Sequence, residues 1–268
     1  MTKNILITGS TDGIGKLAAN KMAKAGHQLY LHGRNESKLE TVISELKRTS
    51  GNDHIEGFVA DFSDLNQVQQ MAQDVEEKLL HLDVLINNAG VLKSPNTTAE
   101  NGLDIRFVVN YLAPFLLTTR LMKILSKKSK ARVINLSSAA QSPISSGIFD
   151  GTNRLSDQEA YAQSKLAILI WSFYLARKQS DVTVIALNPG SLLNTNMVRE
   201  AYGRYWSSAD KGADIIYELS LSPEYVNSSG KYFDNDIGRF GPAHEDAYNT
   251  DLIDSIIQKT NLTLKTFN

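Results

Sequence analysis

The chain has no cysteine among its 268 residues, which excludes disulfides, thiolate metal sites and a cysteine nucleophile. It has only six prolines. No Pro/Ser-rich linker or internal repeat divides it, so we expect one domain over residues 1–268. Neither sign of charge is in excess, because 28 basic residues stand against 29 acidic ones and the formal net charge is −1. This balance gives no electrostatic basis for binding nucleic acid or an anionic membrane.

Long hydrophobic runs are also missing. No run approaches the length of a transmembrane helix, and the N-terminal segment 1–8 enters an apolar stretch without a signal-peptide pattern. Hydrophobic content of 42% is ordinary for a protein with a sizeable core. We therefore expect a soluble cytoplasmic protein with no membrane span. No metal site is expected.

Short apolar runs alternate with segments of helical length through most of the chain. The apolar runs suit strands that are buried on both faces of a parallel sheet, and they lie at 5–7, 29–31, 55–60, 84–86, 133–136, 182–187 and 231–233. Helices are expected at 15–24, 37–49, 65–80, 103–127 and 158–178, with a helical tail at 245–259. The alternation predicts an α/β fold: a single-domain Rossmann fold with a doubly wound parallel sheet of about seven strands and helices on both faces. Residues 141–157 have the composition of a loop, and a small substrate lid is expected around 191–210.

A glycine-rich segment, Thr8-Gly-Ser-Thr-Asp-Gly-Ile-Gly15, stands between the first expected strand and the first expected helix. Its glycines permit a tight turn in which helix-terminal N–H groups face a pyrophosphate. The segment is neither a Walker loop nor Gly-x-Gly-x-x-Gly, and a turn without a ligand is the alternative interpretation. The cofactor contacts expected here are Gly9, Ser10, Thr11, Asp12, Gly13, Ile14 and Gly15.

The end of the second expected strand favours NADP over NAD. An acidic residue there bonds the ribose hydroxyls of NAD, whereas an arginine suits a 2′-phosphate. The strand ends in Leu31-His-Gly-Arg34-Asn35, with no carboxylate before Glu36. Arg34 can meet a phosphate in a charge-assisted contact; otherwise it is a surface arginine. Asp12 adds repulsion near the phosphate, and NAD stays possible.

Tyr161 and Lys165 lie four residues apart in an expected helix, so their side chains are neighbours. A free phenol has a pKa of about 10 and is a poor acid or base near neutrality. A nearby cation favours the phenolate, so Lys165 is expected to lower the pKa of Tyr161 into a useful range. By itself the pattern arises often by chance, as a helix-face tyrosine beside a solvated lysine.

Six motifs in order resemble the short-chain dehydrogenase/reductase family over nearly the whole chain. They are Thr8 to Gly15, Asn87-Asn-Ala-Gly90, Asn110 in Val-Val-Asn-Tyr, Ser138 after the run 133–136, Tyr161 to Lys165, and Pro189-Gly190. Each is modest alone, but their order and their places at strand ends make coincidence very improbable.

The resemblance implies a role for each matching residue. Tyr161 is implied as the general acid in carbonyl reduction or the base in alcohol oxidation, and Ser138 as the residue that positions the substrate oxygen. Lys165 is implied to lower the tyrosine pKa and hold the nicotinamide ribose, and Asn110 to order a relay water. Ser137 competes with Ser138 for the serine role, and the family pattern favours Ser138.

The remaining implied positions line the cofactor. Asp61 and Phe62 are implied for the adenine pocket. Further contacts are implied at Asn87, Asn88, Ala89, Gly90, Pro189, Gly190, Ser191 and Leu192. The usual threonine position holds Asn194, with Thr195 one later, so which of the two contacts the cofactor stays open.

The gap of 23 residues from Ser138 to Tyr161 is about ten longer than is usual in the family. It resembles the retinol-dehydrogenase-like and WW-domain oxidoreductase-like branch, which also includes protochlorophyllide-reductase-like members. Relatives often pair through the helices that correspond to 103–127 and 158–178. A homodimer or homotetramer is therefore expected, unless the longer loop favours a monomer.

An NADP-dependent oxidoreductase that interconverts a small-molecule carbonyl and alcohol is the leading hypothesis. A catalytically silent NADP(H)-binding sensor or scaffold on the same fold is the alternative, although the complete Asn-Ser-Tyr-Lys set argues against it. A sugar-nucleotide epimerase is disfavoured by the glycine spacing and by the short segment after Pro189. The substrate and the direction of reaction are not given by the sequence. Tyr202, Tyr205 and Trp206 in the lid line a substrate pocket or serve as ordinary packing residues.

Overall fold

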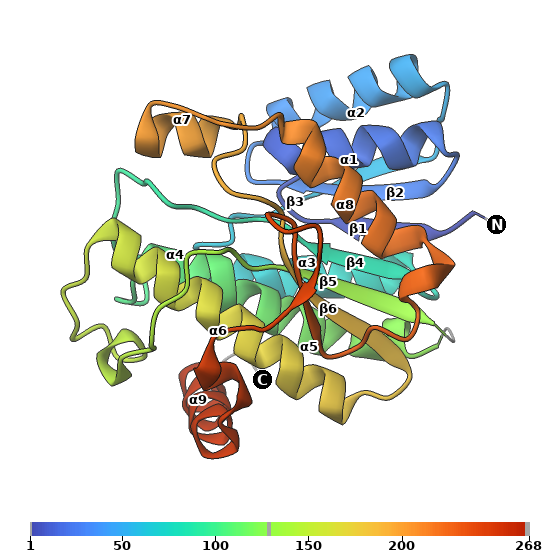
Figure 1. Cartoon of the computed structure of the whole chain (residues 1–268). Coiled ribbons are helices and arrows are strands. Elements are labelled where there is room, and N and C mark those ends of the chain that lie inside the picture. Colours follow the sequence, from blue (N-terminus) through green and yellow to red (C-terminus); the bar gives the residue numbers. More distant parts are fainter. Residues whose placement is uncertain (1, 128–129, 266–268) are drawn as a thin grey trace.

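The computed structural model describes residues 2–127 and 130–265, and an eight-stranded sheet runs through its centre (Figure 1). The strands are β1 Asn4–Ile7, β2 Gln28–Gly33, β3 Ile55–Val59, β4 Val84–Asn87, β5 Ala131–Leu136, β6 Val182–Asn188, β7 Lys231–Asp234 and β8 Arg239–Gly241. Their order is β3-β2-β1-β4-β5-β6-β7-β8. Neighbouring strands are parallel from β3 to β7, and only β8 pairs antiparallel. The predicted doubly wound fold is confirmed. The eighth strand was not predicted, because three residues are too few to show an alternating pattern.

Helices cover both faces of the sheet. They are α1 Gly13–Lys24, α2 Glu36–Ser50, α3 Leu65–Lys78, α4 Ile105–Phe107, α5 Ala113–Leu125, α6 Asp157–Lys178, α7 Asn196–Tyr202, α8 Ala209–Leu221 and α9 Thr250–Thr263. Figure 1 shows α1, α2 and α8 on one side of the sheet, and α5 and α6 on the other. Because order along the sheet reverses between β1 and β4, the carboxyl ends of these strands form a crevice that suits a ligand.

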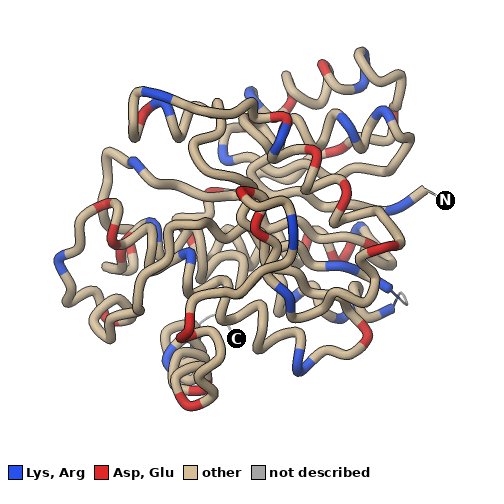
Figure 2. The backbone as a smooth tube through the Cα atoms, viewed as in Figure 1, with Lys and Arg blue, Asp and Glu red and all other residues tan. Residues whose placement is uncertain are grey.

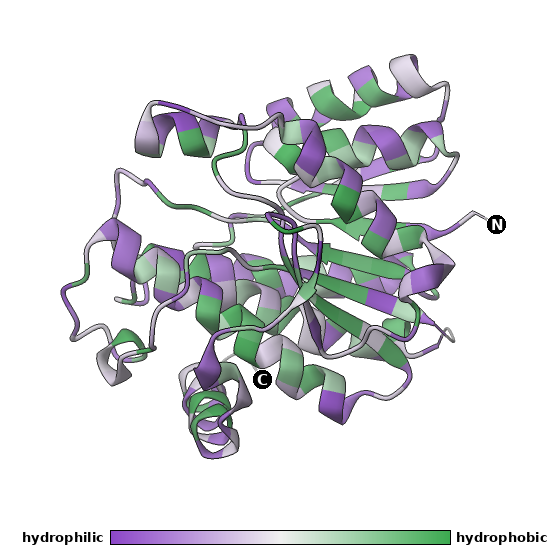
Figure 3. Cartoon of the chain, viewed as in Figure 1, coloured by the Kyte–Doolittle hydropathy of each residue, from purple (hydrophilic) through white to green (hydrophobic). Residues whose placement is uncertain are grey.

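Two hydrophobic cores follow from the alternation of side chains along each strand. Ile5 and Ile7 face α1, α2 and α8 in one buried cluster. Leu6, between them, faces the other cluster, which is built from α3, α5, α6 and α9. Figure 3 shows this distribution, with the central strands coloured apolar and polar residues along the outer sides of the helices.

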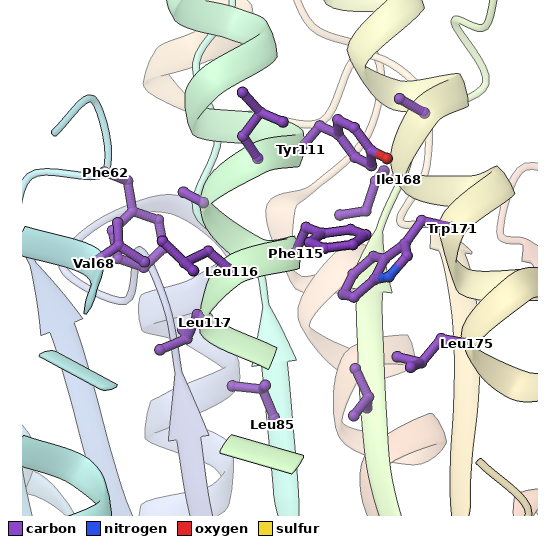
Figure 4. Close-up of a cluster of buried hydrophobic side chains, with 14 of the residues drawn as sticks. Phe62, Val68, Leu85, Tyr111, Phe115, Leu116, Leu117, Ile168, Trp171 and Leu175 are labelled. Carbon is purple, nitrogen blue, oxygen red and sulfur yellow. The ribbon is translucent and has the colours of Figure 1, made fainter. Parts of the chain in front are cut away.

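The second core anchors α6, the helix that carries Tyr161 and Lys165. Phe115 of α5 packs on Trp171 of α6 with ring centroids 5.2 Å apart (Figure 4). Trp171 is 1% exposed, and full burial of a large apolar side chain contributes about 1.5–3 kcal/mol. A capping box between Ser156 and Glu159 begins the helix, which stabilises its first turn. The catalytic candidates therefore stand on a helix whose start and position are both well determined.

The helical run Ile105–Leu125 bears on the expectation that no apolar run approaches the length of a transmembrane helix. Within the part of the chain that the structure describes, it is the one helix long and apolar enough to cross a membrane, with a mean hydropathy of 1.2. However, 78% of its most apolar 18-residue stretch is buried inside the protein. A helix buried between a sheet and a neighbouring helix passes the same test of length and composition.

Two helical segments of the C-terminal half also depart from the sequence expectations. Helix α8 was not predicted; Ser208 caps it by accepting a hydrogen bond from the N–H of Asp210. The expected tail helix 245–259 divides into a 3-10 turn, Glu245–Tyr248, and α9. The division occurs because the Asn249 side chain caps the start of α9 by accepting a hydrogen bond from the Leu252 N–H. The expected loop is largely irregular between β5 and α6, apart from a short 3-10 turn, Ser146–Ile148. Figure 2 shows charges of both signs interspersed along the backbone, as the near-zero net charge predicts.

Candidate active site

A cavity of about 420 Å³ lies at the carboxyl edge of the sheet. Its wall includes much of the glycine loop, the end of β2, the segment after β4, the serines after β5, the first turns of α6 and the start of the lid. Of the predicted site residues, it is lined by Gly9, Thr11, Asp12, Gly13, Ile14, Gly15, Arg34, Asp61, Phe62, Asn88, Ala89, Gly90, Ser138, Tyr161, Lys165, Pro189 and Gly190. One continuous site therefore contains most of the predicted residues.

The glycine loop is packed too closely for side chains. Gly9 has a φ of +63°, and a Cβ there would lie 2.7 Å from the Cα of Ala89. A Cβ at Gly15 would lie 2.3 Å from the Asn88 amide nitrogen. Asn88 in turn donates hydrogen bonds to the carbonyls of Thr8 and Gly9. The segment after β4 thus packs against the glycine loop and bonds its carbonyls, and the close approach requires glycine at both positions.

His32, which the sequence analysis did not select, supports the same loop. Its Nδ1 accepts a hydrogen bond from the Gly9 N–H at 3.0 Å, so Nε2 carries the proton and donates to the Ala60 carbonyl at 2.9 Å. The imidazole stacks on Phe62 with centroids 4.1 Å apart. Burial lowers the pKa of His32 to about 4, which keeps the ring neutral. The signal available in the sequence was the alternation of side chains along the strand, which places His32 on the same buried face of the sheet as Tyr30.

Tyr161, Ser138 and Lys165 line the cavity together beside the end of β5. Lys165 Nζ lies 5.5 Å from the centroid of the Tyr161 ring, as the predicted four-residue spacing requires. The same ammonium donates to the Leu136 carbonyl at 2.8 Å. The Ser138 side chain lies near enough to the Tyr161 hydroxyl to lower its pKa. A phenol, a hydroxyl and an ammonium therefore face one space from three different positions along the chain.

The pKa of Tyr161 corrects the sequence expectation. Burial raises it to about 12, the hydrogen bond with Ser138 opposes this, and Tyr202 adds to the rise. The Lys165 nitrogen lies 5.5 Å from the centroid of the ring and is bonded to the Leu136 carbonyl, and burial outweighs any lowering of the Tyr161 pKa. Burial also lowers the pKa of Lys165 itself to about 8. In the protein alone, Tyr161 is therefore a protonated acid at neutral pH.

Asn110 stands in a π-helical segment, Val108–Leu112, between α4 and α5. Such segments occur mostly as single turns within longer helices and frequently at functional sites. Its side chain accepts from the Val91 N–H at 2.8 Å and donates to the Val91 carbonyl and to Ser164 Oγ, both at 3.0 Å. It lies behind Gly90, where a Cβ would come within 3.3 Å of its Oδ1. Its side chain fixes the segment after β4 to α6 and does not line the cavity.

The two neighbouring serines are used differently. Ser137 Oγ donates to the Lys165 carbonyl at 2.7 Å and is buried. Ser138 Oγ accepts a hydrogen bond from the Ala140 N–H, and the Ser138 side chain lies near enough to the Tyr161 hydroxyl to lower its pKa. These contacts favour Ser138 over Ser137 as the residue that holds a substrate oxygen.

Four predicted cofactor contacts do not line the cavity: Ser10, Asn87, Ser191 and Leu192. Ser10 bonds the backbone of His32, and Asn87 is buried against Thr118 and Asn135. The hydroxyl of Ser191 donates to Asp236. The side chains of Ser10, Asn87 and Ser191 therefore bond neighbouring parts of the protein, a role that strand-end position alone does not distinguish from ligand contact.

The lid contributes one of the two residues that the sequence left open and several that were not predicted. Thr195 lines the cavity and Asn194 does not, since Asn194 accepts hydrogen bonds from Arg199. Met197, Val198 and Glu200 of α7 also line it. The exposed lid aromatics are not on this wall: Tyr202, Tyr205 and Trp206 are 42%, 51% and 70% exposed.

The cavity suits a dinucleotide. Ile14 and Gly15 of the first turn of α1 line it, and first-turn N–H groups lack intrahelical acceptors, which suits phosphate oxygens. Arg34 follows β2 and can serve as a cation for a phosphate, whereas Lys165 bonds the end of β5, three strands along the sheet, and can donate to ribose hydroxyls. The residues in place therefore fit a nicotinamide dinucleotide.

Comparison with known proteins agrees with this geometry. The sequence model of the family described as short chain dehydrogenase matches residues 3–205. The chain belongs to the short-chain dehydrogenase family. This short-chain dehydrogenase is 34% identical to human retinol dehydrogenase 13 over 254 residues, which cover 87% of this chain and 76% of that protein. The predicted retinol-dehydrogenase-like branch is confirmed.

Two further relatives bear on the reaction class. A Streptomyces protein named as a daunorubicin C-13 ketoreductase is 33% identical over 240 residues, covering 86% of this chain and 82% of that protein. A short chain dehydrogenase from Escherichia coli CFT073, solved in complex with NADPH, superposes with a TM-score of 0.72 at 27% identity, covering 87% and 96% of the two chains. With the family match, these relatives support the predicted class, an NAD(P)-dependent oxidoreductase.

Because Lys165 is buried, we expect the free energy of unfolding of this dehydrogenase to change with pH in the alkaline range. Its pKa is about 8 in the folded state against an ordinary value of 10.5. Between these values the unfolded chain binds more protons, so folded stability rises with pH. We expect the free energy of unfolding of the wild type, relative to Lys165→Met, to increase on the order of 2 kcal/mol from pH 7 to 10. Urea unfolding of both proteins at each pH measures this difference. A difference that stays constant with pH would contradict the burial of a titrating Lys165.

Proposed function

We propose that this protein is an NADP-dependent oxidoreductase that interconverts a carbonyl and an alcohol, with Tyr161 as proton donor and acceptor. The observation that carries the proposal is that Tyr161, Ser138 and Lys165 line one cavity, with the Lys165 ammonium 5.5 Å from the centroid of the phenol ring and the Ser138 side chain near enough to Tyr161 to lower the pKa of its hydroxyl. A positioned phenol beside a positioned hydroxyl is the arrangement that protonates and holds a carbonyl oxygen during reduction.

The side chains divide the chemistry between them. Bound NADPH supplies the hydride in the reducing direction. Ser138 donates a hydrogen bond to the substrate oxygen and keeps it beside Tyr161. Tyr161, protonated at neutral pH because burial raises its pKa to about 12, transfers its proton to that oxygen as negative charge develops. Lys165 holds a ribose hydroxyl and, when charged, stabilises the phenolate that remains. In alcohol oxidation the proton moves in the opposite direction.

The preference for NADP rests on Arg34. Its side chain lines the cavity at the end of β2, where a guanidinium can bond a 2′-phosphate in a charge-assisted contact. The Escherichia coli relative was solved with NADPH, which supports the same cofactor here. The cytoplasmic location and a homodimer or homotetramer stay predictions.

A substrate panel tests the function. Purified protein is mixed with NADPH and a range of aldehydes, ketones and quinones, and with NADP⁺ and the matching alcohols, while absorbance of the reduced cofactor is recorded. We expect turnover with at least one carbonyl class. Binding of NADPH without turnover of any compound would instead support the alternative, a catalytically silent NADP(H)-binding sensor.

A further inference from the structure

Ser138 lies just beyond the point where the chain leaves the sheet. The N–H of Ser137 still bonds the Leu187 carbonyl of β6 at 2.8 Å. Ser138 itself stands in irregular backbone, and the two residues that follow it, Ala139 and Ala140, are exposed. Strand pairing therefore does not set the position of this serine, which depends on the hydrogen bonds that it makes outside the sheet.

Two side chains bond the Ser138 carbonyl. The Nε2 of Gln141 donates to it at 2.7 Å, and the hydroxyl of Tyr232 donates to it at 3.3 Å. Tyr232 belongs to β7 and is 4% exposed. The Oε1 of Gln141 in turn accepts a hydrogen bond from the His244 N–H at 3.3 Å. The Ser138 carbonyl is therefore linked both to β7 and to the segment that follows β8.

The contact with Tyr232 crosses the sheet. Tyr232 pairs with Ala186 of β6, and Ala186 pairs with Asn135 of β5, three residues before Ser138. Neighbouring strands lie about 4.8 Å apart, so only a long side chain on β7 can bridge β6 and reach the end of β5. The phenol of Tyr232 has this length, and its hydroxyl ends at the Ser138 carbonyl.

The hydroxyl of Ser138 has a defined direction as well. Its Oγ accepts a hydrogen bond from the Ala140 N–H at 3.1 Å. A serine hydroxyl has one proton to donate and accepts through its lone pairs. Because the contact with Ala140 uses a lone pair, the proton stays available for a substrate oxygen. Bonds to the carbonyl and to Oγ together fix Ser138 on the cavity wall.

We propose that Gln141 and Tyr232 are positioning residues for the carbonyl–alcohol reaction: they hold the Ser138 carbonyl and so keep its hydroxyl beside Tyr161. This role rests on the proposed function, in which Ser138 holds the substrate oxygen. Gln141 and Tyr232 do not line the cavity, so each acts through Ser138 and not on the substrate. A misplacement of about 1 Å in an active site can cost about a hundredfold in rate, and the loss of one of the two contacts is expected to cost a smaller factor.

Steady-state kinetics with the best carbonyl from the substrate panel test the proposal. Gln141→Met keeps a side chain of similar length without the N–H donor, and it is expected to lower kcat about tenfold. Tyr232→Phe removes only the longer hydrogen bond and is expected to lower kcat about threefold. In both variants the dissociation constant for NADPH, measured by calorimetry, should stay within about twofold of the wild type.

Tyr30→Phe is the matched control. Tyr30 is a strand tyrosine that is 2% exposed, its hydroxyl accepts a hydrogen bond from Gln28, and it does not line the cavity. The variant therefore loses a comparable buried hydroxyl at a site without contact to Ser138, and it should retain the kcat of the wild type.

The Ser138→Ala background distinguishes positioning from a general weakening of the fold. Ser138→Ala by itself is expected to lower kcat about 10²–10³-fold, the usual cost of losing one donor to the reacting oxygen. In this background Gln141→Met and Tyr232→Phe should each cost less than about twofold more, because no hydroxyl is left to position. A general disturbance would lower kcat by the same factor in both backgrounds, and that result would overturn the inference.

Two further outcomes separate this inference from the function on which it rests. If the wild type turns over a carbonyl and Ser138→Ala slows it, but Gln141→Met and Tyr232→Phe retain full kcat, the inference is overturned and the proposed function stands. A loss of NADPH affinity as large as the loss of kcat in these two variants would overturn it as well, since the damage would then extend to the cofactor site. A wild type that turns over no carbonyl would overturn both.

Discussion

Replacement of Tyr161 by phenylalanine is expected to lower kcat by about 10²–10⁴-fold, the usual contribution of a positioned general acid. The variant loses only the hydroxyl that interacts with Ser138, and the aromatic ring beside the Lys165 ammonium is retained. The dissociation constant for NADPH is therefore expected to change by less than about threefold. Initial rates with the best carbonyl from the substrate panel and calorimetric titration with NADPH measure the two quantities.

Tyr174→Phe is the matched control, because Tyr174 stands on the same helix α6 and is not on the cavity wall. It should retain full turnover. Retained turnover in Tyr161→Phe would remove Tyr161 as proton donor and return attention to the other hydroxyls of the site. A large loss of NADPH affinity in the same variant would show that the phenol acts mainly in binding.

Replacement of Arg106 by leucine is expected to lower the free energy of unfolding by about 1.5–3 kcal/mol, the usual contribution of hydrogen bonds to charged groups. Arg106 is 1% exposed. Its guanidinium bonds Asp104 at 2.7 and 3.0 Å and Asp157 at 2.8 Å. Leucine leaves both carboxylates without this partner. Because Asp157 is the first residue of α6, the contact also fixes the helix that carries Tyr161.

Lys93→Met provides the control within the same cluster. Lys93 bonds Asp157 at 2.8 Å from the exposed side, with 47% of its side chain accessible. Its loss is expected to cost less than about 1 kcal/mol, as for other surface pairs. Urea unfolding of both variants and the wild type measures the difference. A loss of similar size in the two variants would contradict the distinction between the buried and the exposed contact.

Much of the site was predictable because its motifs follow strands. Parallel strands place their carboxyl ends at one edge of the sheet, so Gly9 after β1, Arg34 after β2 and Ser138 after β5 had to gather there. The spacing of Tyr161 and Lys165 required only a helix. These predictions depended on connectivity and periodicity, which the sequence carries directly.

The sequence could not distinguish roles that depend on which way a side chain points. Asn87 and Ser10 stand in the correct segments but face inward, while His32, not predicted, supports the loop and lines the cavity. Helix α8 was missed although Ser208 offers a capping residue. The hydrogen bond from Asn196 to Asp12 could not be predicted for another reason, because the two residues are 184 positions apart in the chain.

The sequence by itself determined the family, the doubly wound sheet and the identities of the catalytic candidates, because local periodicity and strand-end motifs specify them. Only the tertiary structure decided the electrostatic state of the site. Burial raises the pKa of Tyr161 to about 12 and lowers that of Lys165 to about 8, the reverse of what their adjacency on a helix suggested for the phenol. Desolvation depends on everything that packs around a group, and that environment is assembled from segments far apart in the chain.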